Sequence, residues 1–397
     1  MAGESMFWNP FLETLAPERL KALQLAKFKR IMTWAFDHSP FYRSHYERAG
    51  LTPGDIGTWS DVSRIPKVDK AMLQEAQTSG LFPYGRLLAL PPEEVVCFRQ
   101  TSGTTGRPVY QADSWGDWEW WSECWSYLLW AQGYRPRDRV FIPFGYNVFV
   151  AFWAGHYAAE KIGCEVVPGG VLDTAARVLK IQELEATAMM GTPTYLLNMA
   201  EVARERLGLN PGALTLEKIT CAGEPGGLIA STKKRLESLW GARVFDHAGA
   251  TEIGAWGFEC SRQSGGLHAN EAFFLVEIED IQTGEPIVEP GRPGKMIVTA
   301  FDRLAQPCIR FDSKDIIEWA PAPCSCGRTF RLLKGGVLGR VDDITKVKGV
   351  LLAPAAVEEV VRGFEACEGE FEVVVDRVGD LDRITLRVEL ALSLIHI

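Results

Sequence analysis

The sequence has no excess of basic residues, no long apolar run and no recognisable secretory signal. Its 42 lysines and arginines are outnumbered by 51 aspartates and glutamates, for a formal net charge of -9. Non-specific nucleic-acid binding depends on basic side chains that neutralise phosphates, so we expect no nucleic-acid partner. No apolar run approaches the length of a membrane span, and the first residues lack the basic and apolar regions of a signal peptide. We therefore expect no membrane association either.

Cysteine is too sparse for a disulfide scaffold. The nine cysteines are an odd number spread through 397 residues. This pattern is typical of a reducing compartment, and we expect a cytoplasmic protein. The apolar share of 47% and the charged share of 23% are ordinary for a globular chain, whose length allows two or three domains.

The most unusual local stretch is FRQTSGTTGRPVY, at 98–110. Glycine lets the backbone approach a ligand closely, and successive N–H groups form a concavity that suits anions. Hydroxyls and a guanidinium add further donors, so the loop is a candidate phosphate site. An ordinary polar turn is the alternative, because the same residue types dominate loops. The spacing of Gly103 and Gly106 excludes a Walker loop.

The pattern of apolar runs predicts the fold class. From 138 to 300, short apolar runs alternate with helical patterns, as in a largely parallel sheet with helices on both faces. Residues 267–320 are typical of antiparallel strands, and 356–390 of a helix and two strands. We expect an α/β protein: a large N-terminal domain of mixed, mostly parallel sheets flanked by helices, a β-rich subdomain, and a small α+β C-terminal domain. Ligands of such sheets bind in loops at the carboxyl ends of strands, here after 190, 220 and 246.

Five motifs in a fixed order carry a resemblance. After TSGTTGRP come CAGEPGG at 221–227, DHAGATEIGAWG at 246–257, RFDSKDII at 310–317 and LGRVDDITKVKGV at 338–350. In this order the chain resembles the adenylate-forming superfamily of acyl- and aryl-CoA ligases. With FWNPF and SPFYRSHYERAG near its start, it looks most like the phenylacetate–CoA ligase branch. The resemblance implies a large AMP-binding domain at 1–340, a hinge at Asp342 and a C-terminal lid over 341–397.

The resemblance also implies an ATP site. Its residues are Thr101, Ser102, Gly103, Thr104, Thr105, Gly106, Arg107, Ala222, Gly223, Glu224, Ala248, Gly249, Thr251, Asp315 and Arg340. The first seven match the loop around the β- and γ-phosphates, with Arg107 in place of the usual lysine. Residues 222–224 match the segment along adenine, and Ala248 stands where the family often has an aromatic that stacks on the base. Asp315 matches the acceptor for the ribose hydroxyls.

Three residues are implied to be catalytic: Thr251, Glu252 and Arg340. Thr251 and Glu252 match the pair at the α-phosphate, where a carboxylate suits Mg²⁺. Arg340 matches the arginine that contacts ribose or phosphate. A single acidic residue in a loop is usually solvated, so these roles depend on the motifs occurring together.

The implied activity is ATP-dependent activation of an aryl or arylacetic carboxylate, with Mg²⁺ as cofactor. An acyl-adenylate forms first and is then transferred to coenzyme A. Two alternatives stay open: transfer to a carrier protein or another acceptor, and a non-catalytic protein that binds nucleotide or acid. The expected partners are therefore a small carboxylic acid, ATP and coenzyme A, and a homodimer is left open.

Tyr146, Phe149 and Trp153 are candidates for the acyl pocket, because the matching segment lines that pocket in relatives. Aromatic walls suit an aryl or arylacetic acid. Core packing of an amphipathic helix is the alternative. Trp118, Trp121 and Trp125 share one helical face. We interpret them as core residues, with lining of the substrate pocket as the alternative.

Cys260, His268, Cys324 and Cys326 form a candidate structural zinc site. Thiolates and imidazole are the usual ligands of such zinc, and four of them complete a tetrahedron. The spacing matches no compact finger pattern, so the two pairs would have to meet in the fold. Free buried cysteines and a surface histidine are the alternative.

The end of the chain lacks one residue that the family uses. Relatives carry a catalytic lysine late in the lid, whereas the last lysine here is Lys348. The lid is therefore expected to be truncated, as a gene fragment or as a natural short end. We expect this polypeptide to bind ATP but to form acyl-adenylate slowly.

Overall fold

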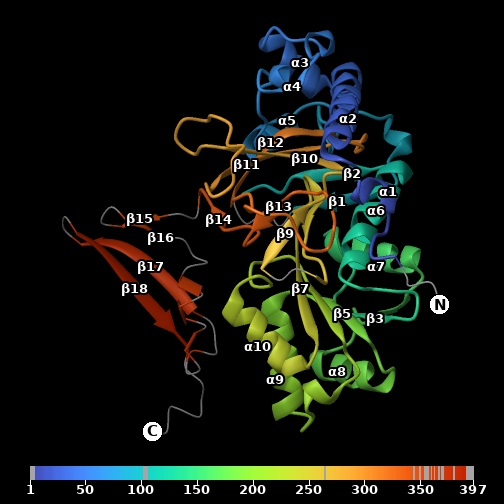
Figure 1. Cartoon of the computed structure of the whole chain (residues 1–397), viewed down its shortest axis with the longest axis vertical. Coiled ribbons are helices and arrows are strands. Elements are labelled where there is room, and N and C mark those ends of the chain that lie inside the picture. The colour runs from blue at the N-terminus through green and yellow to red at the C-terminus, as the bar shows by residue number, and fades with distance from the viewer. Residues whose placement is uncertain are drawn as a thin grey trace.

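The computed structural model describes residues 5–101, 106–262, 265–342, 345–347, 350–352, 357–358, 360–361, 363–364, 367, 371–378 and 381–389 (Figure 1). Its largest sheet has eight strands in the order β13-β9-β8-β7-β6-β5-β3-β4. In chain order the strands are β3 (Arg139–Ile142), β4 (Glu165–Pro168), β5 (Ala188–Gly191), β6 (Lys218–Cys221), β7 (Arg243–Ala250), β8 (Gly254–Phe258), β9 (Gly266–Ala269) and β13 (Leu332–Lys334).

The large sheet changes direction at β7. Pairing is parallel from β4 to β7 and antiparallel from β7 to β13. Helices connect the parallel strands: α7 (Ala151–Ile162), α8 (Thr174–Glu183), α9 (Pro193–Glu205) and α10 (Ala230–Trp240). The four residues of β5 are all buried, as expected for a central parallel strand. The predicted mixed, mostly parallel sheet with flanking helices is confirmed.

A second sheet forms the β-rich part of the molecule. Its antiparallel strands are β10 (Phe274–Glu279), β11 (Gly294–Ala300), β12 (Cys308–Ile317) and β14 (Gly339–Arg340). A separate hairpin of β1 (Cys97–Gln100) and β2 (Tyr110–Asp113) carries the predicted phosphate loop between its strands. The β-rich subdomain is therefore also confirmed.

Helices α2 to α5 lie at one end of the molecule and α8 to α10 at the other, while α1 lies beside α6 (Figure 1). The helices of the N-terminal part are α1 (Pro10–Glu13), α2 (Pro17–His38), α3 (Pro40–Arg48), α4 (Trp59–Val62) and α5 (Lys70–Ala76), with 3-10 turns at Pro53–Asp55 and Pro92–Glu94. A further 3-10 turn, Pro211–Ala213, follows α9. Proline opens α1, α2 and α3, where its missing N–H costs nothing. Ser39 separates α2 from α3 and accepts a hydrogen bond from the Tyr42 backbone N–H, which caps α3. None of the described helices combines the length and apolar character needed to cross a membrane.

Helix α6 (Trp115–Ala131) is buried along most of its length. Ser114 and Asp117 form a capping box at its start, which satisfies backbone N–H groups of the first turn. Trp118, Trp121 and Trp125 are buried, so the interpretation as core residues is confirmed. Trp121 and Trp125 also line a cavity, so these two buried residues belong both to the core and to a cavity wall.

The C-terminal part contains two hairpins, β15 (Thr345–Val347) with β16 (Val350–Leu352) and β17 (Phe371–Val378) with β18 (Leu381–Val388). The second hairpin agrees with the two strands predicted around a turn at 379–380. Of the helix predicted at 356–366, residues 357–358 and 360–361 are helical and 363–364 form a turn, whereas 356, 359, 362, 365 and 366 lie outside the described residues. The domain boundary at 340 stays a prediction.

A glycine between the sheets allows a test of close packing. Gly254 has φ +129°, and a Cβ added there would lie 2.5 Å from Trp120 Cη2 and 2.8 Å from Phe274 Cζ. We expect Gly254→Ala to lower the free energy of unfolding by about 1–3 kcal/mol for backbone strain and by about 1–3 kcal/mol more for overpacking. Gly133→Ala is the matched control, because Gly133 has φ +96° with nothing within 4 Å of the added Cβ. Urea unfolding that gives equal losses for both variants would contradict the packing argument.

Candidate active site

Two cavities meet at the carboxyl end of β7. The first, the aromatic cavity, has a volume of about 560 Å³, and its aromatic walls are Trp121, Trp125, Phe144, Tyr146, Phe149, Phe152 and Trp153. The second, the charged cavity, has a volume of about 520 Å³, and its ionisable lining residues besides His247 are Glu224, Asp246, Asp315, Arg340 and Glu358. Gly223, His247 and Gly249 belong to the walls of both. The two cavities are therefore neighbours that share one wall.

The three residues predicted for the acyl pocket all line the aromatic cavity. Helix α7 begins at Ala151, so Tyr146 and Phe149 lie in the loop before it. The Tyr146 hydroxyl lies 2.7 Å from His156 Nδ1, and the indole N–H of Trp153 donates to the Asn147 carbonyl at 2.8 Å. Core packing of a helix therefore does not account for the two loop side chains, and Phe149 is 45% exposed.

Thr251 and Glu252 follow β7 and line the aromatic cavity. Their backbone carbonyls accept hydrogen bonds from Arg303 Nη1 at 2.8 and 2.9 Å. Arg303 is fully buried and pairs with the fully buried Asp113 at 3.2 Å. A guanidinium has fixed donor directions, so this contact sets the orientation of the 251–252 backbone. No motif in the sequence had singled out Arg303.

Lys70 is a second residue that the sequence motifs did not identify. It opens α5, whose N-cap is Asp69, and its side chain lines the aromatic cavity. Its Nζ lies 3.2 Å from Glu252 Oε1. Glu252 is therefore a buried carboxylate at the cavity wall with one cationic partner, and its oxygens are the ligand type that Mg²⁺ prefers. The donor chemistry thus fits the predicted magnesium ligand.

The predicted phosphate loop leaves β1 beside this group. Ser102, Gly103, Thr104 and Thr105 lie outside the described residues. Thr101 also lines the aromatic cavity, and its hydroxyl accepts a hydrogen bond from the Val109 N–H at 3.0 Å. On the far side of the loop, Gly106 has φ +128° and the Arg107 carbonyl accepts a hydrogen bond from Gln74 of α5. Helix α5 thus supplies Lys70 to the wall of the aromatic cavity and, through Gln74, a hydrogen bond to the end of the phosphate loop.

The charged cavity collects most of the residues predicted for the nucleoside. Ala248 and Gly249 line it, as does Gly223, whose φ of +94° favours glycine. The Glu224 carboxylate accepts a hydrogen bond from the Thr194 N–H at 2.6 Å in the first turn of α9. Ala222, by contrast, lines the aromatic cavity.

Asp315 and Arg340 face each other across the β12–β14 pairing, with an ion pair at 3.4 Å. Arg340 also pairs with Asp342, the predicted hinge residue, at 2.8 Å. Within the described chain, Asp342 and Arg107 lie outside the walls of both cavities. The predicted hinge is therefore connected to the charged cavity through Arg340.

His247 of the shared wall and its neighbour Asp246, which lines the charged cavity alone, have pKa values shifted in opposite directions. Burial raises the pKa of Asp246 to about 7, and the nearby Glu259 carboxylate adds to the rise. Burial lowers the pKa of His247 to about 4, and its Nδ1 lies 3.0 Å from the Gly257 carbonyl. Between about pH 4 and 7 both side chains are therefore mainly neutral in the folded protein. At neutral pH the shared wall of Gly223, His247 and Gly249 therefore carries no side-chain charge.

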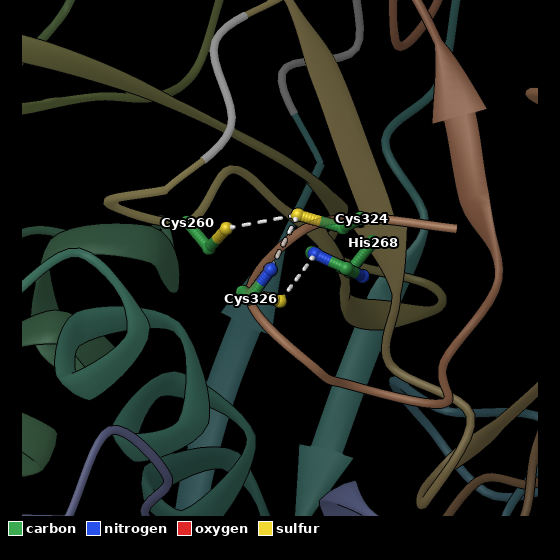
Figure 2. A group of neighbouring side chains, drawn as sticks. All are labelled: Cys260, His268, Cys324 and Cys326. Atoms are coloured by element: carbon green, nitrogen blue, oxygen red, sulfur yellow. Dashed lines mark hydrogen bonds between the residues drawn. The ribbon is translucent and has the colours of Figure 1, made fainter. Parts of the chain in front are cut away.

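The four residues predicted for zinc also come together. The ligand atoms of Cys260, His268, Cys324 and Cys326 all lie within 4.8 Å of one another, and all four residues are buried (Figure 2). They line neither cavity. His268, which the alternative placed at the surface, has no exposed area.

Two family models match the chain. The model described as AMP-binding enzyme matches residues 18–300, and that described as AMP-binding enzyme C-terminal domain matches residues 349–396. The phenylacetate-coenzyme A ligase of Thermus thermophilus is 33% identical over 390 residues, which cover 97% of this chain and 85% of that protein. The phenylacetate-coenzyme A ligase of Escherichia coli is 29% identical over 390 residues, which cover 97% of this chain and 86% of the relative.

Solved structures give a consistent picture. A 2-hydroxyisobutyryl-CoA ligase in the postadenylation state with 2-HIB-AMP has a TM-score of 0.92 at 28% identity, covering 99% of this chain and 83% of that chain. The same ligase with 2-HIB-AMP and CoA has a TM-score of 0.83 at 28% identity, covering 100% of this chain and 84% of that chain. A benzoate CoA ligase from Burkholderia xenovorans, at 18% identity and a TM-score of 0.56, shares the fold over 78% of this chain and 61% of that chain.

Replacing Asp246 and His247 one at a time should change the pH dependence of stability in opposite directions. Unfolded Asp246 ionises near pH 3.8, so the folded state keeps an extra proton up to about pH 7 and loses stability as the pH rises through that range. Asp246→Asn removes this loss. Unfolded His247 gains a proton near pH 6.5 and the folded residue only near pH 4, so stability is lost as the pH falls between these values. His247→Gln removes that loss.

Urea unfolding at a series of pH values measures both effects. Relative to the parent, Asp246→Asn should gain stability as the pH rises, and His247→Gln should gain stability as it falls. Stability curves that run parallel to the parent curve for both variants would contradict the two shifts.

Proposed function

The chain belongs to the AMP-binding enzyme family as an adenylate-forming CoA ligase, and we propose that it activates an aryl or arylacetic carboxylate. The superfamily predicted from the order of five motifs is thereby confirmed, whereas the acid is our proposal. One observation carries it: an aromatic cavity that shares a wall with a charged cavity and contains Thr251, Glu252 and Lys70. An acid bound in the first cavity would present its carboxylate to a nucleotide bound in the second.

The proposed reaction has two balanced steps. An oxygen of the acid carboxylate attacks the α-phosphorus of ATP, the bond to the bridging oxygen of the β-phosphate breaks, and pyrophosphate leaves. The sulfur of coenzyme A then attacks the acyl carbon, the thiol proton passes to solvent, and AMP leaves with the bonding electrons. Both steps need positioned reactants and compensated charge more than covalent help from the protein.

Each residue of the site has a proposed role in this reaction. Thr251 and Glu252 face the α-phosphate, held in orientation by Arg303. Glu252 is the proposed ligand of Mg²⁺, which when bound neutralises charge on the phosphates. Asp315 accepts hydrogen bonds from the ribose hydroxyls, and Arg340 contacts ribose or phosphate.

The hinge is proposed at Asp342, with residues 341–397 as the lid. Its pairing with Arg340 supports this assignment, because movement of the lid about Asp342 would then be felt directly in the charged cavity. Lys348, the last lysine of the chain, lies outside the described residues.

We propose that Lys70 supplies a cation for adenylation. Its ammonium group reaches the Glu252 carboxylate from the N-terminal part of the chain and lines the same cavity. A fixed positive charge there would compensate the charge that develops on the phosphates.

The aromatic walls favour a flat, apolar acid. Tyr146 and Trp153 contact each other edge to face with ring centroids 4.8 Å apart, and Phe144 stacks on Phe152 at 4.1 Å. Such pairs form flat apolar surfaces that suit another aromatic ring. A small hydroxy acid is the second candidate, because the TM-score of 0.92 is to a 2-hydroxyisobutyryl-CoA ligase.

A substrate screen tests the acid class. We expect coenzyme A-dependent AMP release to be fastest with phenylacetate, benzoate or their ring-substituted forms and slow with 2-hydroxyisobutyrate. Faster release with 2-hydroxyisobutyrate would favour the second candidate. Pyrophosphate release without coenzyme A-dependent turnover would instead favour another acceptor, and no release with any acid would favour a binding protein.

Lys70→Ala tests the source of the cation. We expect the rate of pyrophosphate release to fall on the order of 100-fold, as when one donor to a developing anion is removed. Lys70→Arg should recover part of the rate because it keeps the charge. Lys180→Ala is the matched control, since Lys180 pairs with Glu183 on α8 and lies outside both cavity walls. A parental rate in Lys70→Ala would contradict the proposed role.

A further inference from the structure

We propose that Cys260, His268, Cys324 and Cys326 form a structural zinc site that ties the edge of the large sheet to the loop before β13. Cys260 follows β8, His268 lies in β9, and the other two cysteines lie in the loop between β12 and β13 (Figure 2). The pair Cys260 and His268 is more than 50 residues away in sequence from the pair Cys324 and Cys326, and His268 and Cys326 are 58 residues apart. All four are buried.

The distances fit one tetrahedral ion. Cys260 Sγ lies 3.7 Å from Cys324 Sγ, and Cys326 Sγ lies 3.4 Å from His268 Nε2. With Zn–S of about 2.3 Å and Zn–N of about 2.0–2.1 Å, a tetrahedron has edges of about 3.8 Å between two sulfurs and about 3.6 Å between sulfur and nitrogen. A disulfide would need about 2.05 Å between sulfurs. The separations therefore leave room for a metal and are too long for a disulfide.

The imidazole is oriented for coordination. His268 Nδ1 lies 3.2 Å from the Phe330 carbonyl oxygen, which can accept only a hydrogen bond. The proton is therefore on Nδ1, and the lone pair of Nε2 points to the sulfur cluster. A ring N–H that donates to a backbone carbonyl is the usual second contact of a zinc-bound histidine.

The loop also directs backbone N–H groups at two sulfurs. The Cys326 N–H donates to Cys324 Sγ and the Arg328 N–H to Cys326 Sγ, each at 3.5 Å. Gly327, at φ +83°, makes the turn between them. Donors aimed at sulfur stabilise the thiolate, which is the form that binds metal. Chance packing of free thiols would require neither these donors nor a fixed imidazole.

The same loop holds the N-terminal segment. Arg328 is buried and pairs with the buried Glu13 of α1, while its Nη2 donates to the Met6 carbonyl at 3.0 Å. The Thr329 N–H donates to the Glu13 carbonyl at 2.9 Å. A metal at the cysteines would therefore hold three parts together: the sheet edge, the loop and the first helix.

The chemistry of the four ligand atoms indicates which metal the site would bind. Three thiolates and one imidazole with all four positions filled by protein suit zinc in a structural role and leave no open position for a substrate. The site therefore contributes to folding and takes no part in adenylation. Its test does not depend on the activity of the enzyme.

Metal analysis of the full chain, produced with zinc in the medium and without a metal-affinity tag, tests the site. We expect about one zinc per chain in the parent and less than a tenth of that in Cys326→Ala. Cys124→Ala is the matched control, because Cys124 is a buried free cysteine of α6 outside the cluster, and it should keep its zinc. A parent without near-stoichiometric zinc, or a Cys326→Ala protein that retains it, would overturn the proposal.

Cobalt substitution keeps the test valid if Cys326→Ala fails to fold. The parent refolded with Co²⁺ alone should show intense visible absorption of a tetrahedral ion and thiolate-to-cobalt charge transfer. The weak spectrum of an octahedral ion would overturn the proposal. A chelator should also lower the melting temperature of the parent and of Cys124→Ala, and an unchanged melting temperature in a zinc-free parent would rule out a structural role.

Discussion

The buried guanidinium of Arg303 is the contact on which the arrangement of the site depends. It donates to the carbonyls of Thr251 and Glu252 and pairs with Asp113, which also accepts a hydrogen bond from the Trp121 indole. A buried charge is costly unless it is paired and hydrogen-bonded. Here Nη1 and Nη2 bond to the 251–252 carbonyls and to Asp113, and the guanidinium lies 5.4 Å from the ring centroid of Trp121. The motif after β7, the end of β2 and helix α6 are thereby held in one orientation.

The topology of the large sheet determines where the two cavities lie. Parallel strands β5, β6 and β7 end at the same edge, so the loops after them meet there. The reversal of direction at β8 then turns the 251–252 segment back into the cavity wall. Helix α5 comes from another part of the chain and adds Lys70 beside Glu252. The site is thus composed of strand ends that the fold brings together and of one helix packed against them.

The cysteine cluster has a different position and purpose. It lies in the antiparallel part of the large sheet, between β8, β9 and the loop before β13. Through the pair of Arg328 and Glu13, that loop contacts the N-terminal segment. Glu259, next to Cys260, binds Lys233 at 2.7 Å and accepts a hydrogen bond from the Asp246 N–H. A rigid sheet edge therefore supports the wall shared by the two cavities without supplying a reacting group.

The sequence by itself determined the fold class, the order of the binding motifs and the aromatic character of the acyl segment. These depend on local patterns: alternating apolar runs, glycine at positions of positive φ, and short motifs whose residues lie close together in the chain. Even the four zinc-ligand candidates could be named from residue type alone. A helix was predicted from 148, so the position of Phe149 in the loop before Ala151 was not predicted, because helix boundaries depend on packing as well as on periodicity.

Only the tertiary structure decided which distant residues meet. The contacts of Lys70 with Glu252 and of Arg303 with Asp113 span 182 and 190 residues. No local sequence motif distinguishes Lys70 or Arg303 from the other lysines and arginines of the chain. The same holds for the convergence of the cysteines and His268 on one point. Long-range pairing of this kind is set by the sheet order and by the burial of charge, neither of which leaves a local pattern in the chain.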